Sequence, residues 1–171
     1  MKMLNEFIIP FSSLKFGSNF HKFEIDKTFF ESFDYYRFQD CKIKLHLDFR
    51  KENSLMDLQF NYIGKMEISC DRCLDNVNVK SSGKFNTILK FSHVIDEVSN
   101  DGVIFLPYER YEFNLAPLFY EYSVLNLPNK VIHNKGLCNK QQLELINQYS
   151  SSSNISKYEF RWSKLKDLKN N

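Results

Sequence analysis

The sequence predicts an α+β fold: an antiparallel β-sheet meander of long strands with a few short helices packed on one side. Two observations predict the sheet. Apolar and polar residues alternate over residues 41–50, and they alternate again from Met56 to Cys70. A third observation, the helical spacing of apolar residues between Leu115 and Leu125, predicts the main helix. The chain of 171 residues fits one domain.

The strands follow from the alternation, taken in chain order. The first run places one apolar set on a buried face: Cys41, Ile43, Leu45, Leu47 and Phe49. Residues 51–54 form a turn, and the second run buries Met56, Leu58, Phe60 and Tyr62, with a bulge predicted at Gly64. Turn-prone residues 71–76 separate this strand from a third at residues 77–91. A short strand at 103–106 precedes Pro107.

The helices lie in the second half of the chain. Asn114 is the predicted N-cap of a helix over residues 115–125, and Pro117 is tolerable in its first turn. Its predicted apolar face contains Leu115, Leu118, Phe119, Tyr122 and Leu125. A loop is predicted after Pro128, over residues 129–139, and a second short helix is predicted over residues 141–149.

Residues 1–149 are therefore predicted to form a single α+β domain with a cysteine-containing hairpin turn. Residues 150–171 are predicted to form a Ser-rich linker and a short basic amphipathic tail, in which Trp162, Leu165 and Leu168 recur at spacings of three.

The composition excludes several classes of protein. A chain that is 43% hydrophobic and 16% aromatic is not disordered. The net charge of +2 gives no broad nucleic-acid-binding footprint. No segment approaches the length of a membrane-spanning helix, and the N-terminus does not resemble a signal peptide, so we expect a cytoplasmic protein without a membrane partner. In that compartment thiols stay reduced, which favours a metal-binding or catalytic role for a CxxC motif.

The four residues of the candidate metal site come in two pairs. Cys70 and Cys73 lie at a strand-to-strand turn, and His133 and Cys138 lie in the loop after the main helix, where Gly136 lets the chain bend. Zinc takes four Cys or His ligands in structural sites, so any cofactor is expected to be zinc.

Two alternatives remain open for these cysteines. One is that the thiols are free in a merely ordered turn, and the other is that Cys70 and Cys73 form a redox pair with Arg72 stabilising a thiolate. A redox pair of the thioredoxin type sits at a helix N-terminus, whereas this pair lies between strands. No nucleophile, acid–base or phosphate-binding motif assembles elsewhere, so we do not expect an enzyme.

Basic residues cluster in sequence near the cysteine turn and the 129–140 loop: Arg72, Lys80, Lys84, Lys90, Lys130, Lys135 and Lys140. They would contact phosphates if they shared one face. Scattered surface lysines are the more ordinary interpretation in a charge-balanced protein.

Three motifs together resemble the YceD family of large ribosomal RNA subunit accumulation proteins, in a Bacteroidetes-type branch. They are C-D-R-C-L from Cys70, N-L-A-x-x-x-Y-E-x-x-x-L-x-L-P from Asn114, and R-W-S-K-L-K-D-L-K from Arg161. The similarity extends from Glu24 to Lys169. Many relatives carry a longer cysteine-rich segment around a GLC motif. Here it is reduced to Gly136-Leu137-Cys138, which leaves both a Cys3His zinc site and a metal-free site open.

The resemblance implies a non-enzymatic ribosome-biogenesis factor that promotes synthesis, processing or stability of 23S ribosomal RNA. Its partner would be ribosomal RNA or a large-subunit ribosomal protein. The residues expected to contact that partner are Arg72, Lys130, Lys135, Arg161, Trp162 and Lys164. The alternative is a small zinc- or thiol-dependent binding protein without a ribosomal role.

Overall fold

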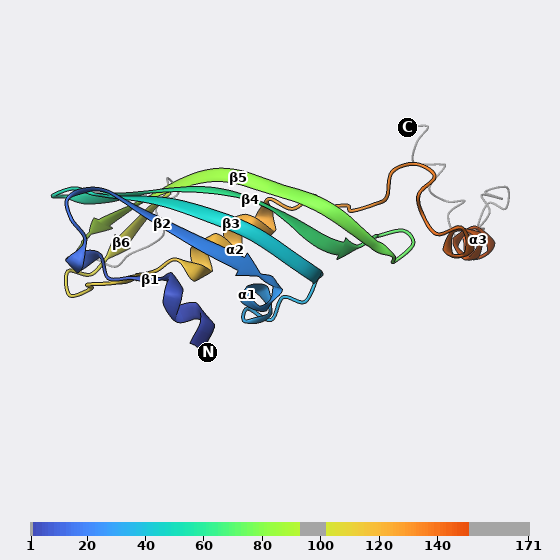
Figure 1. Cartoon of the computed structure of the whole chain (residues 1–171), viewed down its shortest axis with the longest axis horizontal. Helices are drawn as coiled ribbons and strands as arrows, with labels where there is room; N and C mark the ends of the chain where they lie inside the picture. The colour runs from blue at the N-terminus through green and yellow to red at the C-terminus, as the bar shows by residue number, and fades with distance from the viewer. Residues whose placement is uncertain (1, 93–101, 151–171) are drawn as a thin grey trace, which may run out of the picture.

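A five-stranded sheet of long strands dominates the computed structural model, which describes residues 2–92 and 102–150 (Figure 1). Neighbouring strands are antiparallel except the last pair, in which β6 runs parallel to β5. The predicted α+β class is confirmed. In spatial order the strands are β2 (Gly17–Asp26), β3 (Phe38–Lys51), β4 (Leu55–Ser69), β5 (Asn76–Phe91) and β6 (Val103–Leu106).

The inner face of the sheet is the one that the alternation predicted. Side chains at odd positions of β3 between Cys41 and Phe49 are at most 1% exposed, and Met56, Leu58, Phe60 and Tyr62 of β4 are at most 2% exposed. The polar residues between them lie on the outer face, because successive strand side chains point to opposite sides. This pattern places the core on one side of the sheet only.

The bulge predicted at Gly64 is wrong. Gly64 pairs in register with Ile43 of β3 and with Ser81 of β5. A Cβ atom at Gly64 would lie 2.3 Å from the carbonyl oxygen of Lys42 and 2.6 Å from Cα of Ile43. The glycine therefore permits a close approach of two strands, a role that Gly also has within strands.

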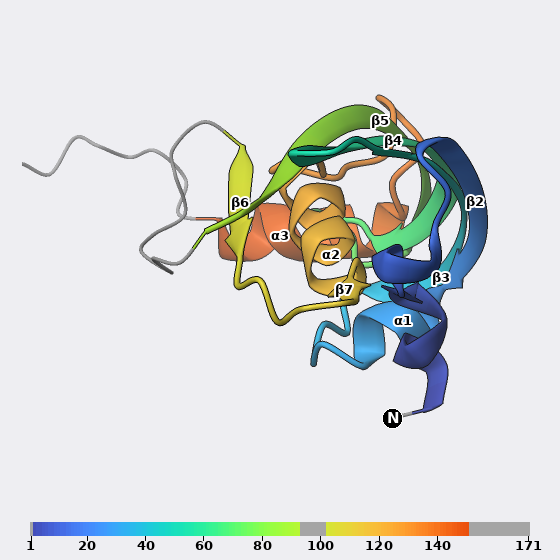
Figure 2. The same ribbon diagram turned by 90° about the vertical axis from the view of Figure 1, so that its left-hand side faces the viewer.

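The main helix, α2 (Ala116–Leu125), lies against the inner face, in the curve of the sheet (Figure 2). Asn114 supplies the predicted cap, since its Oδ1 accepts a hydrogen bond from the backbone N–H of Ala116 at 3.0 Å. The predicted apolar face is wrong at one end: Leu125 is 83% exposed, and the buried side chains of the helix are Ala116, Phe119 and Ser123. Leu125 lies about half a turn around the helix from Ala116 and so faces away from the sheet, whereas Ser123, in the same last turn, is buried.

Phenylalanines from the N-terminal part of the chain close one end of the core. Phe7 and Phe29 have ring centroids 5.0 Å apart, and Phe29 packs edge-on against Phe119 of α2. They come from segments that the sequence analysis left unassigned: a 3-10 helix, η1 (Lys2–Phe7), and a short helix, α1 (Lys27–Glu31). Three further short elements lie nearby: β1 (Ile8–Ile9), which pairs with β7 (Phe113–Asn114), and a 3-10 turn, η2 (Phe11–Ser13).

One edge of β5 is only partly covered. β6 pairs with residues 88–91 alone. Farther along, the Asn126 side chain donates a hydrogen bond to the carbonyl oxygen of Ser82 at 3.1 Å, and to the Tyr62 hydroxyl at 2.7 Å. Asn126 thus ties the end of α2 to this edge.

The second predicted helix is α3 (Lys140–Tyr149), which lies beyond the sheet at the end that carries the β4–β5 turn (Figure 1). It has no buried residue, and its one half-buried side chain, Leu143, packs against the cysteine cluster. None of the described helices has the length and apolar character needed to cross a bilayer. The predicted tail lies outside the described residues.

Candidate metal centre

The first half of the site is the turn between β4 and β5. The backbone N–H of Cys70 donates to the carbonyl of Asp75 at 2.8 Å, and the N–H of Leu74 donates back to the carbonyl of Cys70 at 2.9 Å. Leu74 adopts a left-handed conformation with φ of 65°. This tight turn brings the sulfur atoms of Cys70 and Cys73 close together.

The second half is the loop between α2 and α3. Gly136 has φ of 87°, which a residue without Cβ adopts at no steric cost, and the N–H of Leu137 donates to the carbonyl of Asn134 at 3.0 Å. The bend brings Cys138 back toward His133. Asn139, the next residue, caps α3 by accepting a hydrogen bond from the N–H of Gln141 at 3.0 Å.

Asp71 joins the two halves. Its backbone N–H donates to the carbonyl of Val131 at 2.7 Å, and its side-chain Oδ2 accepts from the N–H of Val131 at 2.6 Å. The other carboxylate oxygen lies 3.8 Å from a guanidinium nitrogen of Arg37. The role of Asp71 is not predictable from the sequence, since its partner Val131 is 60 positions away and contributes only backbone atoms. We call this pair of hydrogen bonds the Asp71–Val131 latch.

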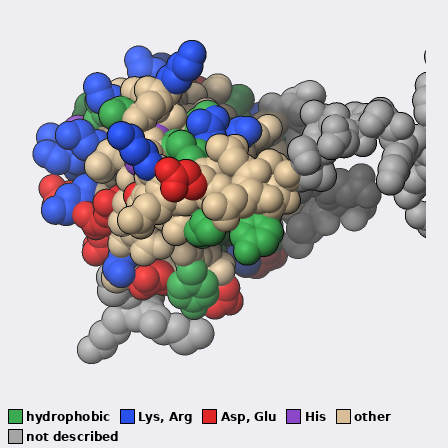
Figure 3. Space-filling view, turned by 90° about the vertical axis from the view of Figure 1, so that its right-hand side faces the viewer, with side chains coloured by type: hydrophobic (Ala, Val, Ile, Leu, Met, Phe, Trp, Pro, Cys, Tyr) green, Lys and Arg blue, Asp and Glu red, His purple; other side chains and the backbone are tan. Residues whose placement is uncertain are grey.

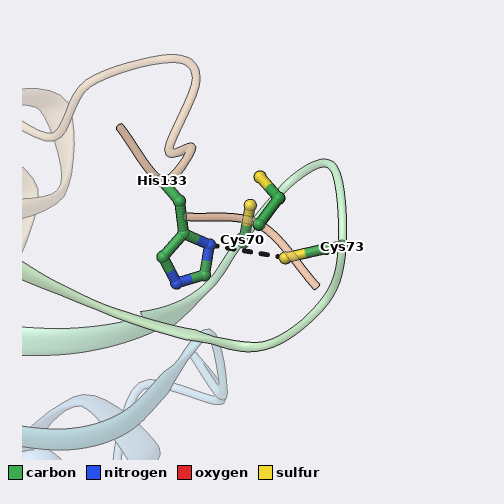
Figure 4. A group of neighbouring side chains, drawn as sticks. Cys70, Cys73 and His133 are labelled. Atoms are coloured by element: carbon green, nitrogen blue, oxygen red, sulfur yellow. Dashed lines mark hydrogen bonds between the residues drawn. The ribbon is translucent and has the colours of Figure 1, made fainter. Parts of the chain in front are cut away.

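The four predicted ligands meet at one point. The sulfur atoms of Cys70, Cys73 and Cys138 and a ring nitrogen of His133 all lie within 4.8 Å of one another. Figure 4 shows the His133 ring directed at Cys73, whose Sγ lies 3.4 Å from Nδ1. The three cysteines are at most 6% exposed, and Val77 and Leu143 pack against them.

The backbone orients the His133 ring. Nε2 lies 3.2 Å from the carbonyl oxygen of Asn76, an atom that can only accept a hydrogen bond. A ring protonated on Nε2 would donate to this carbonyl and present the lone pair of Nδ1 to a metal ion held by the sulfurs. Metal-ligating histidines are commonly held this way by a backbone carbonyl.

The surroundings of the site shift the pKa values of the Cys70 and Cys138 thiols in opposite directions. Burial acts to raise the pKa of Cys70, but hydrogen bonds from the backbone of Cys73, Arg72 and His133, together with the His133 side chain, outweigh it and lower that pKa to about 6. The backbone N–H of Arg72 lies 3.4 Å from its sulfur. Burial, and then the neighbouring Cys73 and Cys70, raise the pKa of Cys138.

This arrangement suits metal coordination better than thiol exchange. Three sulfurs and one imidazole nitrogen are a donor set that tetrahedral structural zinc takes. Thiol–disulfide exchange needs an attacking sulfur that a partner can reach, and Cys70 and Cys73 are 0% and 1% exposed. They also lie in a turn between strands, as predicted, and neither residue is itself in the first turn of a helix, where a redox pair of the thioredoxin type sits. Cys41 is a core residue of β3, also as predicted.

The predicted contact residues are only partly gathered at this site. Arg72 is exposed, and its Nη1 lies 4.0 Å from Cys138 Sγ, so its side chain also contacts the cysteine cluster. Lys130 and Lys135 are exposed on the loop that carries His133. Arg161, Trp162 and Lys164 lie outside the described residues.

The comparisons with known proteins yield a family but no individual relative. No curated protein and no solved structure matches the chain. One family model does, under the description "Large ribosomal RNA subunit accumulation protein YceD", and it aligns with residues 58–169. This stretch is more than half of the chain and includes both cysteine-bearing loops. On this match, the chain belongs to the YceD family.

Proposed function

We propose that this protein is a non-enzymatic ribosome-biogenesis factor that promotes the accumulation of 23S ribosomal RNA in the large subunit. The observation that carries the proposal is the family match over residues 58–169, whose printed description names large ribosomal RNA subunit accumulation. Its partner would be ribosomal RNA or a large-subunit ribosomal protein, and its compartment the cytoplasm. The Bacteroidetes-type branch stays a prediction.

The test is depletion of the protein in its own cells. We expect the ratio of 23S to 16S RNA to fall and mature large subunits to decline in sucrose gradients, with recovery when the wild-type chain is supplied. Unchanged ratios and unchanged gradients in fully depleted cells would reject the ribosomal role. They would favour the alternative, a small zinc- or thiol-dependent binding protein without such a role.

We further propose that Cys70, Cys73, His133 and Cys138 hold one zinc ion. The support is the chemistry of the donor set, the spread of at most 4.8 Å among the ligand atoms, and the carbonyl that orients His133. Bound there, zinc would act as a structural cross-link between the β4–β5 turn and the loop before α3. Arg72 would add a positive charge beside the thiolates.

Metal analysis of protein purified without chelators tests this assignment. We expect about one zinc per chain in the wild type and far less in Cys73→Ser, because a hydroxyl is a poor substitute for a thiolate ligand. Cys41→Ala is the matched control: it removes a buried cysteine of the core and should keep its zinc. A wild-type chain without metal, or equal zinc in Cys73→Ser, would contradict the assignment.

A further inference from the structure

Lysines gather on the outer face of the sheet at a place where the strand register puts like charges side by side. Lys65 of β4 stands directly opposite Lys42 of β3 and directly opposite Lys80 of β5. All three side chains are exposed. Directly opposed like charges destabilise a sheet, so this row works against the stability of the fold.

The next two rows continue the basic surface. Lys44 pairs with Ile63, which pairs with Ser82, and His46 pairs with Asn61, which pairs with Lys84. We call the nine outward residues of these three rows the lysine face: Lys42, Lys44, His46, Asn61, Ile63, Lys65, Lys80, Ser82 and Lys84. It contains five lysines and no carboxylate.

Within the described part of the chain, the lysines of this face are not held in ion pairs. Among the ion pairs of the described residues, none involves a lysine of the face. Carboxylates border it on three sides: Asp26 and Glu24 of β2 stand directly opposite Lys42 and Lys44, Asp40 and Glu67 lie at one end, and Asp48 lies at the other. In the register of the described strands, Lys65, Lys80 and Lys84 have no carboxylate directly opposite them. Figure 3, which views the molecule from the end of the β4–β5 turn, shows Lys and Arg side chains along the top and the left side, with Asp and Glu side chains beside them on the left.

The lysine face also contains hollows and exposed apolar side chains. Two open hollows of about 630 and 550 Å³ lie along it, one over the row of Lys65 and the other beside His46 and Lys84. Ile63, in the middle of the face, is 66% exposed, and Phe20, at the rim of the second hollow, is 76% exposed. Amide side chains of Gln59, Asn61 and Asn86 line that hollow.

We propose that the lysine face binds a single strand of RNA. Lysines contact phosphates, exposed apolar and aromatic side chains pack against unstacked bases, and amides offer donors and acceptors to base edges. The repulsion within the row of Lys42, Lys65 and Lys80 would be relieved by a bound polyanion, which gives this unfavourable arrangement a role. The inference rests on the proposed function, because that function supplies RNA as the polyanion.

The first experiment measures binding of the full chain to a fluorescein-labelled single-stranded oligoribonucleotide of about 20 nucleotides by fluorescence anisotropy. In Lys65→Gln/Lys80→Gln we expect affinity to fall about tenfold, and the slope of log affinity against log salt to flatten by roughly 1.4, at about 0.7 per contact. The melting temperature should stay equal or rise, because the opposed charges are gone. Lys15→Gln/Lys140→Gln, with the same net charge, should bind as the wild type does.

A second variant separates base contacts from charge. Ile63→Thr keeps a β-branched residue in the strand and should weaken binding severalfold without changing the salt slope, since no phosphate contact is lost. Equal weakening by the two lysine double variants would overturn the proposal, because it would indicate charge alone. Equal affinity for a DNA duplex of the same length would overturn it too.

The cellular experiment separates this inference from the proposed function. Depleted cells that receive Lys65→Gln/Lys80→Gln should remain low in 23S RNA while the protein itself accumulates normally. Full rescue by this variant would overturn the lysine face as the RNA site and leave the ribosomal role standing. A depleted strain with normal 23S RNA would instead reject the proposed function, whatever the binding measured in solution.

Discussion

Asp71 holds the two halves of the metal centre together through both its backbone and its side chain. The latch to Val131 has bond lengths of 2.7 and 2.6 Å and involves a carboxylate acceptor. Hydrogen bonds to charged groups contribute about 1.5–3 kcal/mol. Without the side chain, the N–H of the buried Val131 would lose its partner.

We therefore expect Asp71→Ala to lower the free energy of unfolding by about 2 kcal/mol, measured by urea denaturation of the zinc-loaded protein. Asp71→Asn keeps an oxygen that can accept the same bond, so its loss should be smaller. Asp75→Ala is the control, since the Asp75 side chain has no hydrogen bond among the described residues and only its carbonyl receives Cys70. An equal loss in all three variants would contradict the latch.

The lowered pKa of Cys70 predicts a pH dependence for the metal-free protein. The thiol titrates near 6 when folded and near its ordinary value of 9.0 when unfolded. Above 9 both states carry the thiolate and its stabilisation is complete, and the contribution is lost as pH falls toward 6.

In chelator and reductant, the wild type should therefore gain more stability between pH 6 and 9 than Cys70→Ala does. Thermal unfolding at a series of pH values measures both curves. The raised pKa of Cys138 acts in the opposite sense, and it is raised less in Cys70→Ala because Cys70 is one of its causes, so the two curves compare Cys70 together with its effect on Cys138. Parallel curves would show that the folded chain does not hold a Cys70 thiolate.

At the scale of the elements, the backbones of β3 and β4 approach each other closely at Gly64. Gly64→Ala would place a methyl group 2.6 Å from Cα of Ile43, and neither backbone can move without opening the ladder. We expect a loss of about 3 kcal/mol, at the upper end of overpacking costs. Denaturant titration measures it.

Gly136→Ala gives the matched control. Nothing lies within 4 Å of a Cβ there, so only the positive φ of 87° is strained. Its cost should be about 1 kcal/mol. Similar costs at both glycines would mean that strand proximity is not what requires Gly64.

The elements also show which features the sequence could predict. The strands β3 and β4 were predictable because one face of the sheet is buried and the other is exposed to solvent. Apolar and polar residues therefore alternate along each strand. The gathering of Cys70, Cys73, His133 and Cys138 was predictable because these residue types and spacings are chemically distinctive, and zinc binding there stays a prediction. Gly64 was misread because close approach depends on the neighbouring strand. The exposure of Leu125 was not predictable because the width of the buried face of α2 depends on the elements that pack against the helix.

At the scale of the whole molecule, the metal centre connects the sheet to the last part of the chain. Cys138 directly precedes Asn139, the cap of α3, and Leu143 is the only residue of that helix that is not exposed. The cluster of Cys70, Cys73, His133 and Cys138 therefore lies where α3 joins the rest of the described chain.

Zinc removal should therefore release α3. We expect chelation to lower the melting temperature and to speed proteolytic cleavage between residues 132 and 150, while amide protons of β3 and β4 stay protected from exchange. Mass spectrometry of the fragments locates the cuts. Cleavage at unchanged rates after complete zinc loss would show that packing alone holds this segment.

The partly covered edge of β5 has a consequence for self-association. Two of its outward carbonyls are occupied, that of Ser82 by Asn126 and that of Asn76 by His133. A strand from another molecule cannot pair continuously along an edge blocked at both places, and unblocked edges invite chain-to-chain pairing and aggregation. If His133 moved away, the carbonyl of Asn76 would lose its hydrogen-bond partner and become available to another strand. Zinc that orders this loop would thereby also keep the protein monomeric at high concentration.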